Sequence, residues 1–228
     1  MNRTRIEWAD FTWNPIVGCL NNCPYCYAYR MARRFDCFPT GFLPTFYRHR
    51  LNEPQTVKKP QNIFVCSMSD MFGDWISEKE IRAIFEACNE APQHRYIFLT
   101  KNPERLHLLT QHGLLPKSQN FWYGTTVPTN EAPFFYSCNK FNFNAFLSIE
   151  PMQSNFSVAS HGLKDVIQWI IVGAETGNRK GKIVPKREWI ENIVESCKNS
   201  GVPLFMKNSL ADIWGEPLIQ EYPWEVEQ

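Results

Sequence analysis

The sequence of 228 residues contains no apolar run that approaches the ~20 residues needed to cross a bilayer. Its opening residues, MNRTRIEWAD, lack the apolar segment of a secretory signal. Gly/Ser-rich linkers, internal repeats and low-complexity tracts are also missing. These absences argue against the membrane, secreted and multidomain classes of protein. We therefore expect one cytoplasmic domain that spans residues 1–228.

The chain has almost no net charge, because 24 Lys and Arg residues face 23 acidic ones. This balance excludes a uniformly basic nucleic-acid coat and an acidic disordered chain. The charges are nevertheless clustered: residues 30–60 carry seven cations and two acids, and residues 178–187 carry five cations and no acid. Aromatic residues interleave the first of these basic segments. They predict contact with an anionic substrate, a nucleotide or a base within nucleic acid; a solvated basic surface is the alternative.

Eight cysteines are present, in two groups. Three of them fall within eight residues, whereas five are scattered along the chain: Cys37, Cys66, Cys88, Cys138 and Cys197. In a reducing compartment cysteines bind metal or stay as buried thiols. Cys88 and Cys197 lie in amphipathic helical patterns and are expected in the core. Cys66 closes a predicted strand and is either a packing thiol or a hydrogen-atom donor inside the fold.

Short apolar or β-branched runs alternate with helical patterns along the chain. The predicted strands are residues 13–18, 63–67, 96–100, 121–125, 145–149, 169–173 and 203–207. The predicted helices are residues 25–35, 78–91 with Ser77 as N-cap, 102–109 and 186–200 before Gly201. Such alternation predicts right-handed βαβ units around a parallel sheet, either open or curled toward a barrel.

Polar residues follow the predicted strands, at the edge where ligands bind in parallel α/β folds. Glu150 and Lys207 lie directly on apolar strands, where an unpaired charge is costly, so a functional role is favoured for both. For the others, ordinary solvent exposure at strand ends is an equal alternative. The set comprises Ser67, Ser69, Asp70, Thr100, Lys101, Thr125, Thr126, Ser148, Glu150, Glu175, Thr176, Lys207 and Asn208.

The clustered thiols, Cys19, Cys23 and Cys26, are spaced by three and then two residues where the first predicted strand leads into the first helix. Three thiolates without a nearby fourth suit a four-iron cluster with one iron open to another ligand. Two other kinds of site stay open. A structural zinc site would take Cys37 or His49 as its fourth ligand. A redox pair would use Cys23 and Cys26 and leave Cys19 unexplained.

This CxxxCxxC spacing, with Tyr25 directly before the last cysteine, resembles the radical S-adenosylmethionine (SAM) superfamily. The whole chain further resembles a phage-associated three-cysteine-motif branch of that superfamily, whose function is poorly defined. The motifs that carry this second resemblance are Ile6-Glu7-Trp8, Thr12-Trp13-Asn14-Pro15, Gly18-Cys19, Cys26-Tyr27-Ala28, Ser67-Met68-Ser69-Asp70, Leu99-Thr100-Lys101, Ser148-Ile149-Glu150-Pro151 and Ile171-Val172-Gly173-Ala174-Glu175-Thr176-Gly177. The chain departs from that branch in its short spacing between the first two cysteines, and in Ala174-Glu175-Thr176-Gly177 where Gly-Glu-Ser-Gly is usual.

The resemblance implies a partial (βα)6 TIM-like barrel of the radical SAM type with an additional C-terminal strand. Cys19, Cys23 and Cys26 would hold a [4Fe-4S] cluster, and SAM would bind its open iron. An external one-electron donor of the flavodoxin or ferredoxin type would reduce the cluster. SAM would then split into methionine and a 5′-deoxyadenosyl radical, which abstracts hydrogen from the substrate. The cofactors supply this chemistry, and the protein places them.

The resemblance also implies roles for the strand-end residues. The expected SAM contacts are Ser67, Ser69 and Asp70 for the methionine part, Tyr25, Gly173 and Glu175 for adenine, and Thr125 and Thr126 for ribose. The candidates for substrate orientation, proton transfer or hydrogen-atom donation are Lys101, Glu150, Glu175, Lys207 and Cys66.

Two rival functions stay open beside this one. A non-catalytic, metal-stabilised nucleic-acid-binding module would bind nucleic acid without turning over SAM. A peptide-modifying radical SAM enzyme is mildly disfavoured, because the sequence shows no appended peptide-recognition domain and no second cysteine-rich cluster domain. Formation of 5′-deoxyadenosine separates the enzymes from the binding module.

Overall fold

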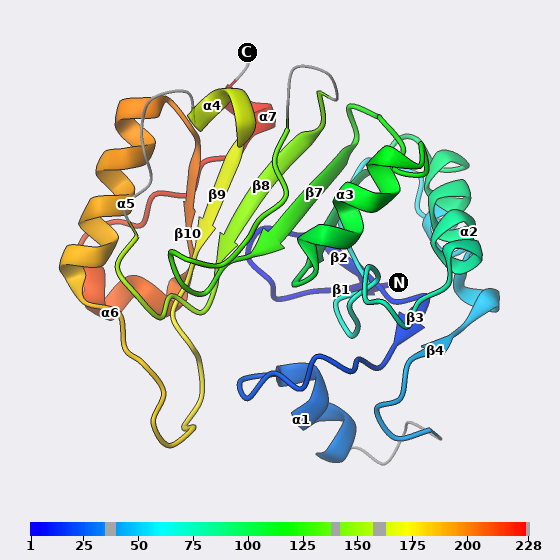
Figure 1. The fold of residues 1–228 in the computed structure, drawn as a ribbon, viewed down its shortest axis with the longest axis horizontal. Helices are drawn as coiled ribbons and strands as arrows, with labels where there is room; N and C mark the ends of the chain where they lie inside the picture. The colour runs from blue at the N-terminus through cyan, green and yellow to red at the C-terminus, as the bar shows by residue number, and fades with distance from the viewer. Residues whose placement is uncertain (35–39, 138–141, 157–162, 227–228) are drawn as a thin grey trace. The chain divides into compact units, whose positions relative to one another are not determined.

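In the computed structural model the described residues are 1–34, 40–137, 142–156 and 163–226. Figure 1 draws the chain as a ribbon coloured by residue number. The described residues group into two compact units, Met1–Trp122 and Tyr123–Gln228. The single domain expected from the sequence stays a prediction. Cys37, Cys138 and the predicted helix end at Phe35 lie outside the described residues.

The first unit contains a sheet with the order β1 (Asn2–Arg3), β2 (Phe11–Trp13), β5 (Asn62–Val65) and β6 (Arg95–Thr100). The pairs β2/β5 and β5/β6 are parallel, and β1 is antiparallel to β2. β3 (Ile16–Val17) and β4 (Thr45–Phe46) form a separate antiparallel sheet. The strand predicted over residues 13–18 is therefore wrong as one element. It breaks at Pro15, which has no backbone N–H to donate to a ladder.

Three helices of the first unit agree with the predicted ones within a few residues: α1 (Tyr27–Arg34), α2 (Glu78–Asn89) and α3 (Pro103–Gln111). Ser77 caps α2 in a reciprocal capping box with Glu80, and the Asn102 side chain caps α3. Two short 3-10 turns, η1 (Arg48–Arg50) and η2 (Pro54–Thr56), were not predicted, because three residues carry no helical periodicity.

An aromatic cluster packs α2 onto the sheet of the first unit. The ring of Phe85 on α2 lies 5.3 Å from Phe98 on β6 and 5.9 Å from Phe121, centroid to centroid. Phe72, from the segment after β5, lies 6.2 Å from Phe98 in an edge-to-face arrangement. These four side chains are almost fully buried, so α2 is held by apolar burial and ring contacts.

The second unit has the strand order β7 (Phe121–Thr126), β8 (Asn144–Ile149), β9 (Trp169–Val172) and β10 (Leu204–Met206), with β7 belonging to it from Tyr123 onward. The pairs β8/β9 and β9/β10 are parallel. Helix α5 (Arg187–Ser200) lies alongside β10 and ends at Gly201 with φ +67°, as predicted (Figure 1). The short elements α4 (Leu163–Val166), η3 (Asn208–Leu210), α6 (Ala211–Trp214) and α7 (Pro223–Val226) were not predicted.

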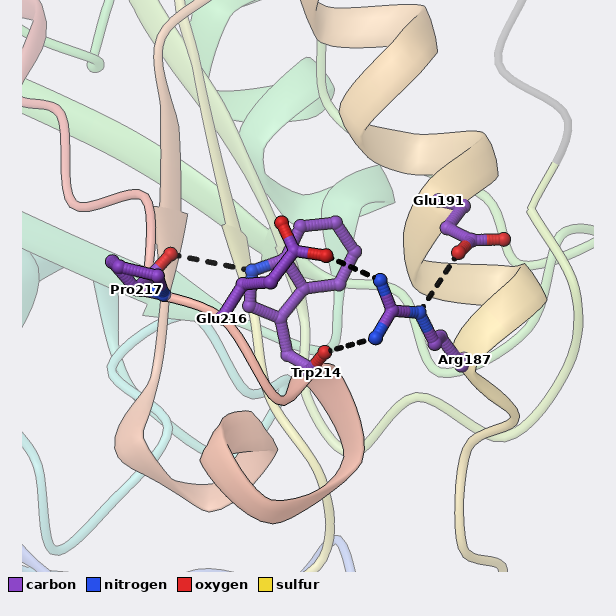
Figure 2. A network of polar contacts seen from close by, with 5 residues as sticks. All are labelled: Arg187, Glu191, Trp214, Glu216 and Pro217. Atoms are coloured by element: carbon purple, nitrogen blue, oxygen red, sulfur yellow. Dashed lines mark hydrogen bonds and ion pairs between the residues drawn. The ribbon is translucent and has the colours of Figure 1, made fainter.

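Arg187, at the start of α5, ties that helix to the chain after α6 (Figure 2). Its guanidinium donates to Glu191 at 2.9 Å, to Glu216 at 2.5 Å and to the carbonyl oxygen of Trp214 at 2.6 Å. It also lies 5.1 Å from the centre of the Trp214 ring. This cation of the second basic segment is therefore engaged in intramolecular contacts, although its side chain is exposed.

The parallel strands of each unit bring their carboxyl ends to one edge of that unit's sheet. The polar residues that follow the strands of a unit therefore lie along the same edge of its sheet. Within the described part of the chain, no helix is long and apolar enough to span a membrane.

Gly124 on β7 precedes the two strand-end threonines, and its place allows no side chain. A Cβ there would lie 2.2 Å from a ring carbon of Phe146, which is fully buried on β8. We expect Gly124→Ala to lower the free energy of unfolding by about 1–3 kcal/mol through overpacking. Urea denaturation measures the loss, and the double variant G124A/F146L should recover part of it. A Gly124→Ala protein as stable as the wild type would contradict this packing.

Cys88 and Cys197 are buried as predicted, Cys66 is buried too, and burial is the main cause of the raised pKa values of all three. The pKa of Cys66 and that of Cys197 rise to about 12, and the pKa of Cys88 rises well above its usual value. Because the thiolate is the reactive form, alkylation by iodoacetamide at pH 8 should be slower in the folded chain than in urea by at least about a hundredfold. Mass spectrometry of tryptic peptides checks this, and equal rates in both states would contradict it.

Candidate cysteine-cluster site

The three clustered thiols lie on one loop, which we call the cysteine loop and define as residues 18–26. It follows β3 and leads into α1. Cys19, Cys23 and Cys26 are all half-buried. Asn22 takes the left-handed conformation with φ +50°, which asparagine tolerates better than most residues. The chain therefore turns at Asn22, directly before the second thiol, Cys23.

Gly18 begins the cysteine loop at a point where main-chain segments almost touch. Its φ is +96°, and a Cβ would lie 2.3 Å from the carbonyl oxygen of Leu43. The amide of Cys19 donates to the carbonyl oxygen of Phe42 at 3.1 Å. Segment 42–43 therefore supports one side of the loop, and only glycine fits at this position.

The turn after β5, residues 66–70, supports the loop from the other side. Cys66 begins it with φ +57°, and its amide donates to the carbonyl oxygen of Trp13 at 2.7 Å. The hydroxyl of Ser69 donates to the carbonyl oxygen of Gly18 at 2.6 Å, and the amide of Gly18 donates to the carbonyl oxygen of Met68 at 3.0 Å. The hydroxyl of Ser67 donates to the side-chain oxygen of Asn14 at 3.1 Å.

Asp70 ends this turn and is 4% exposed. Its Oδ1 accepts from the Phe72 amide at 3.1 Å and from the Thr100 hydroxyl at 2.7 Å. Its Oδ2 accepts from the side-chain amide of Asn21 at 2.9 Å and from the backbone amide of Lys101 at 2.9 Å. One carboxylate therefore joins the cysteine loop, the turn after β5 and the end of β6.

Lys101 and Tyr25 lie at the same site, with the Lys101 ammonium 5.8 Å from the centre of the Tyr25 ring. Burial raises the pKa of Cys19 to about 11, and the charges of Asp70, Cys23 and Cys26 add to this rise. Burial also raises the pKa of Cys23, while the positive charge of Lys101 opposes it. One cation, Lys101, and one carboxylate, Asp70, therefore lie near the Cys23 thiol.

The donor set of the loop fits a four-iron cluster. Among the described residues, no group of three or more His, Cys, Asp or Glu side chains is arranged to hold a single metal ion. A single zinc ion needs every thiolate about 2.3 Å from one point, whereas thiolates on a cuboidal cluster bind separate irons. By its chemistry, a set of three cysteine thiols on one short loop suits the second arrangement.

In the second unit, Glu150 and Lys207 form an ion pair. Glu150 follows β8 and Lys207 follows β10, on either side of β9. Gly173, the residue after β9, has no side chain to crowd this pair. A Cβ there would lie 3.2 Å from Lys207 Cδ and 3.3 Å from Glu150 Cδ. Each charge therefore has a partner, which offsets the free-energy cost of an unpaired charge on an apolar strand.

The other predicted residues of the second unit also have defined partners. Glu175 is buried and accepts two hydrogen bonds from Arg179, at 2.6 and 2.8 Å. Thr125 is buried, and its hydroxyl oxygen accepts from the amide of Phe135 at 3.0 Å. Thr126 is buried as well. Between Gly173 and Glu175, the amide of Ala174 donates to the Ser209 hydroxyl oxygen at 3.0 Å.

The structure thus gathers Tyr25, Ser67, Ser69, Asp70 and Lys101 around the cysteine loop of the first unit. It gathers Glu150, Gly173 and Lys207 in the second. The sequence gave no role to Asn14, Asn21 or Ser209, and it assigned Arg179 to the second basic segment; all four bind predicted residues. Asn14 lies in the motif Thr12-Trp13-Asn14-Pro15, but its contact with Ser67, 53 residues away, has no signal in local spacing.

The two basic segments expose less positive charge than their composition suggests. Arg179 and Arg187 are ion-paired with Glu175, Glu191 and Glu216. Lys180 and Lys186 are exposed, and Lys182 donates to the carbonyl oxygen of Gly177. In the first basic segment, Arg50 stacks on Tyr47 at 4.2 Å and donates to the carbonyl oxygen of Asn14. Phe38 of that segment lies outside the described residues.

The fold is similar to that of spore photoproduct lyase. The structure of that enzyme with dinucleoside spore photoproduct matches with a TM-score of 0.60 at 10% identity, covering 90% of this chain and 78% of that one. A doubly substituted variant with bound AdoMet and dinucleoside spore photoproduct matches with a TM-score of 0.53 at 10% identity, covering 93% and 76%. This likeness confirms the predicted fold class, a mostly parallel α/β sheet of the partial-barrel type.

A comparison with curated proteins gives no match. One family model matches residues 3–219, which is most of the chain, and its description is "Protein of unknown function (DUF5131)". The phage-associated branch suggested by the sequence stays a prediction. By the extent of this match, the chain belongs to the DUF5131 family.

Proposed function

We propose that this protein is a radical SAM enzyme that acts on an anionic substrate, a nucleotide or a base within nucleic acid. One observation carries the proposal: three half-buried thiols with CxxxCxxC spacing lie on a loop that the turn after β5 and segment 42–43 support. The fold adds support, because spore photoproduct lyase is a radical SAM enzyme. When bound, the cluster and SAM supply a 5′-deoxyadenosyl radical.

The chain's own residues prepare this site in two ways. Cys19, Cys23 and Cys26 offer three thiolates from a loop whose partial burial limits access of water. Lys101 places a positive charge near Cys23, which favours the thiolate form that metal binding needs. Tyr25 beside Lys101 offers an aromatic face for adenine, the role that its place in the motif implies.

The substrate proposal rests on polar groups of the second unit. Glu150 and Lys207 pair at the ends of β8 and β10, where ligands bind in parallel sheets. A partly exposed pair of this kind can exchange its internal partner for substrate groups, an anion for Lys207 and a hydrogen-bond donor for Glu150. The exposed Lys180 and Lys186 add charge in the same unit. Structures of spore photoproduct lyase hold a dinucleoside, which supports a nucleotide-like substrate.

The first test is the metal content and SAM chemistry of anaerobically purified protein. We expect about four irons and four sulfides per chain, and 5′-deoxyadenosine on addition of dithionite and SAM. Cys19→Ala, Cys23→Ala and Cys26→Ala should each reduce 5′-deoxyadenosine to the level of protein without cluster, because each removes a cluster ligand.

Cys197→Ala is the matched control, because it removes a buried thiol on α5 and leaves the cysteine loop complete. It should keep the iron content and SAM cleavage of the wild type. One zinc per chain without acid-labile sulfide would refute the radical SAM proposal. Nucleic-acid binding without any SAM cleavage would favour the non-catalytic binding module.

The second test concerns the anionic substrate. If Lys180 and Lys186 contact phosphates of a single strand, Lys180→Gln and Lys186→Gln should each reduce the slope of log Kd against log salt by about 0.7. Fluorescence anisotropy with a labelled oligonucleotide measures the slope. Lys79→Gln, at an exposed position on α2, is the charge-matched control and should leave the slope unchanged. Equal slopes for all three variants and the wild type would exclude these lysines as phosphate contacts.

A further inference from the structure

We propose that Asp70 is a positioning residue that holds the cysteine loop in place and makes no contact with SAM. The inference rests on the proposed function, since it concerns how the chain orients the ligands of a cluster. It departs from the SAM contact that the resemblance implies for this residue. The carboxylate reaches the loop through Asn21, which lies between Cys19 and Cys23.

The acceptor capacity of Asp70 is already in use. A carboxylate has about four lone-pair sites, and four donors converge on this one within 3.1 Å: Asn21, Phe72, Thr100 and Lys101. The side chain is almost fully buried. A SAM ammonium could bind Asp70 only by displacing one of these donors and leaving it without a partner, which is costly in a buried site.

A carboxylate suits this position because all four of its hydrogen-bond partners are donors. An asparagine at this position would have one acceptor oxygen and two donor hydrogens, and would place a donor against the amide of Lys101 or Asn21.

The turn after β5 binds the cysteine loop at a second point. Ser69 donates to the carbonyl oxygen of Gly18, one residue before Cys19, while Asp70 holds Asn21, two residues after it. The first thiol is therefore fixed from both sides by adjacent residues of one turn. The hydrogen bond from the Lys101 amide to Asp70 also fixes the backbone at the end of β6 relative to the turn. It thereby fixes the position from which the Lys101 side chain starts.

The primary test uses Asn21→Ala in the cluster-free chain. This variant removes the tie to the loop and keeps the carboxylate charge and its bonds to Thr100 and Lys101. We expect Cys19 and Cys23 to react with iodoacetamide about tenfold faster than in the wild type, the effect of losing one hydrogen bond to a charged group. The melting temperature should change little. Asp74→Asn, which neutralises an exposed carboxylate bonded to Asn102, is the matched control for Asp70→Asn in the second test.

The second test is cluster assembly and SAM affinity. Asp70→Asn should lower the iron bound per chain, while the fraction that carries cluster binds SAM with the wild-type Kd. The double variant N21D/D70N restores one donor and one acceptor between positions 21 and 70, and should recover part of the iron. These two results would support a positioning role.

Opposite results would overturn the inference. Unchanged alkylation rates in Asn21→Ala would show that the tie does not order the loop. Full iron content with weakened SAM binding in Asp70→Asn would assign the residue to direct SAM contact. The alkylation result stands even if the wild-type chain takes up no cluster, an outcome that would refute the proposed function alone.

Discussion

Four hydrogen-bond donors converge on the buried carboxylate of Asp70, and the geometry of the cysteine site depends on them. Two donors are backbone amides, one is a hydroxyl and one is the side chain of Asn21. Buried donors must find acceptors, so the carboxylate brings three segments that are distant in sequence to one point. The cysteine loop is not part of a strand, so it has no hydrogen bonds of a sheet to hold it. The hydrogen bonds to Asp70 hold it instead.

The sequence predicts the elements whose signal is local. Helices α2 and α5 are long enough for their apolar periodicity to be recognised, and Ser77, Asn102 and Gly201 mark helix ends through local hydrogen bonds and backbone conformation. The alternation of strands and helices predicts the parallel sheet. The CxxxCxxC spacing predicts which thiols lie together, because three ligands on one short loop need no information about the rest of the fold.

Other features depend on contacts between distant residues and could not be predicted. The pairing of Glu150 with Lys207 joins residues 57 apart, and the contact of Ser67 with Asn14 joins residues 53 apart. The pairing of β3 with β4 likewise joins distant residues, and the two residues of β4 give no periodic signal. The charge count of the second basic segment also overstates its free positive charge. Arg179 and Arg187 form ion pairs with acids that lie outside residues 178–187.

Two glycines without room for a side chain differ in what surrounds them, and this difference affects how the chain can evolve. At Gly124 the obstacle is the ring of Phe146, so a second substitution can make space. At Gly18 the obstacle is the main-chain oxygen of Leu43, which every residue type carries. No exchange of side chains at position 43 can therefore compensate for a change at Gly18. Lineages that lose this glycine would have to rebuild the backbone where segment 42–43 meets the cysteine loop.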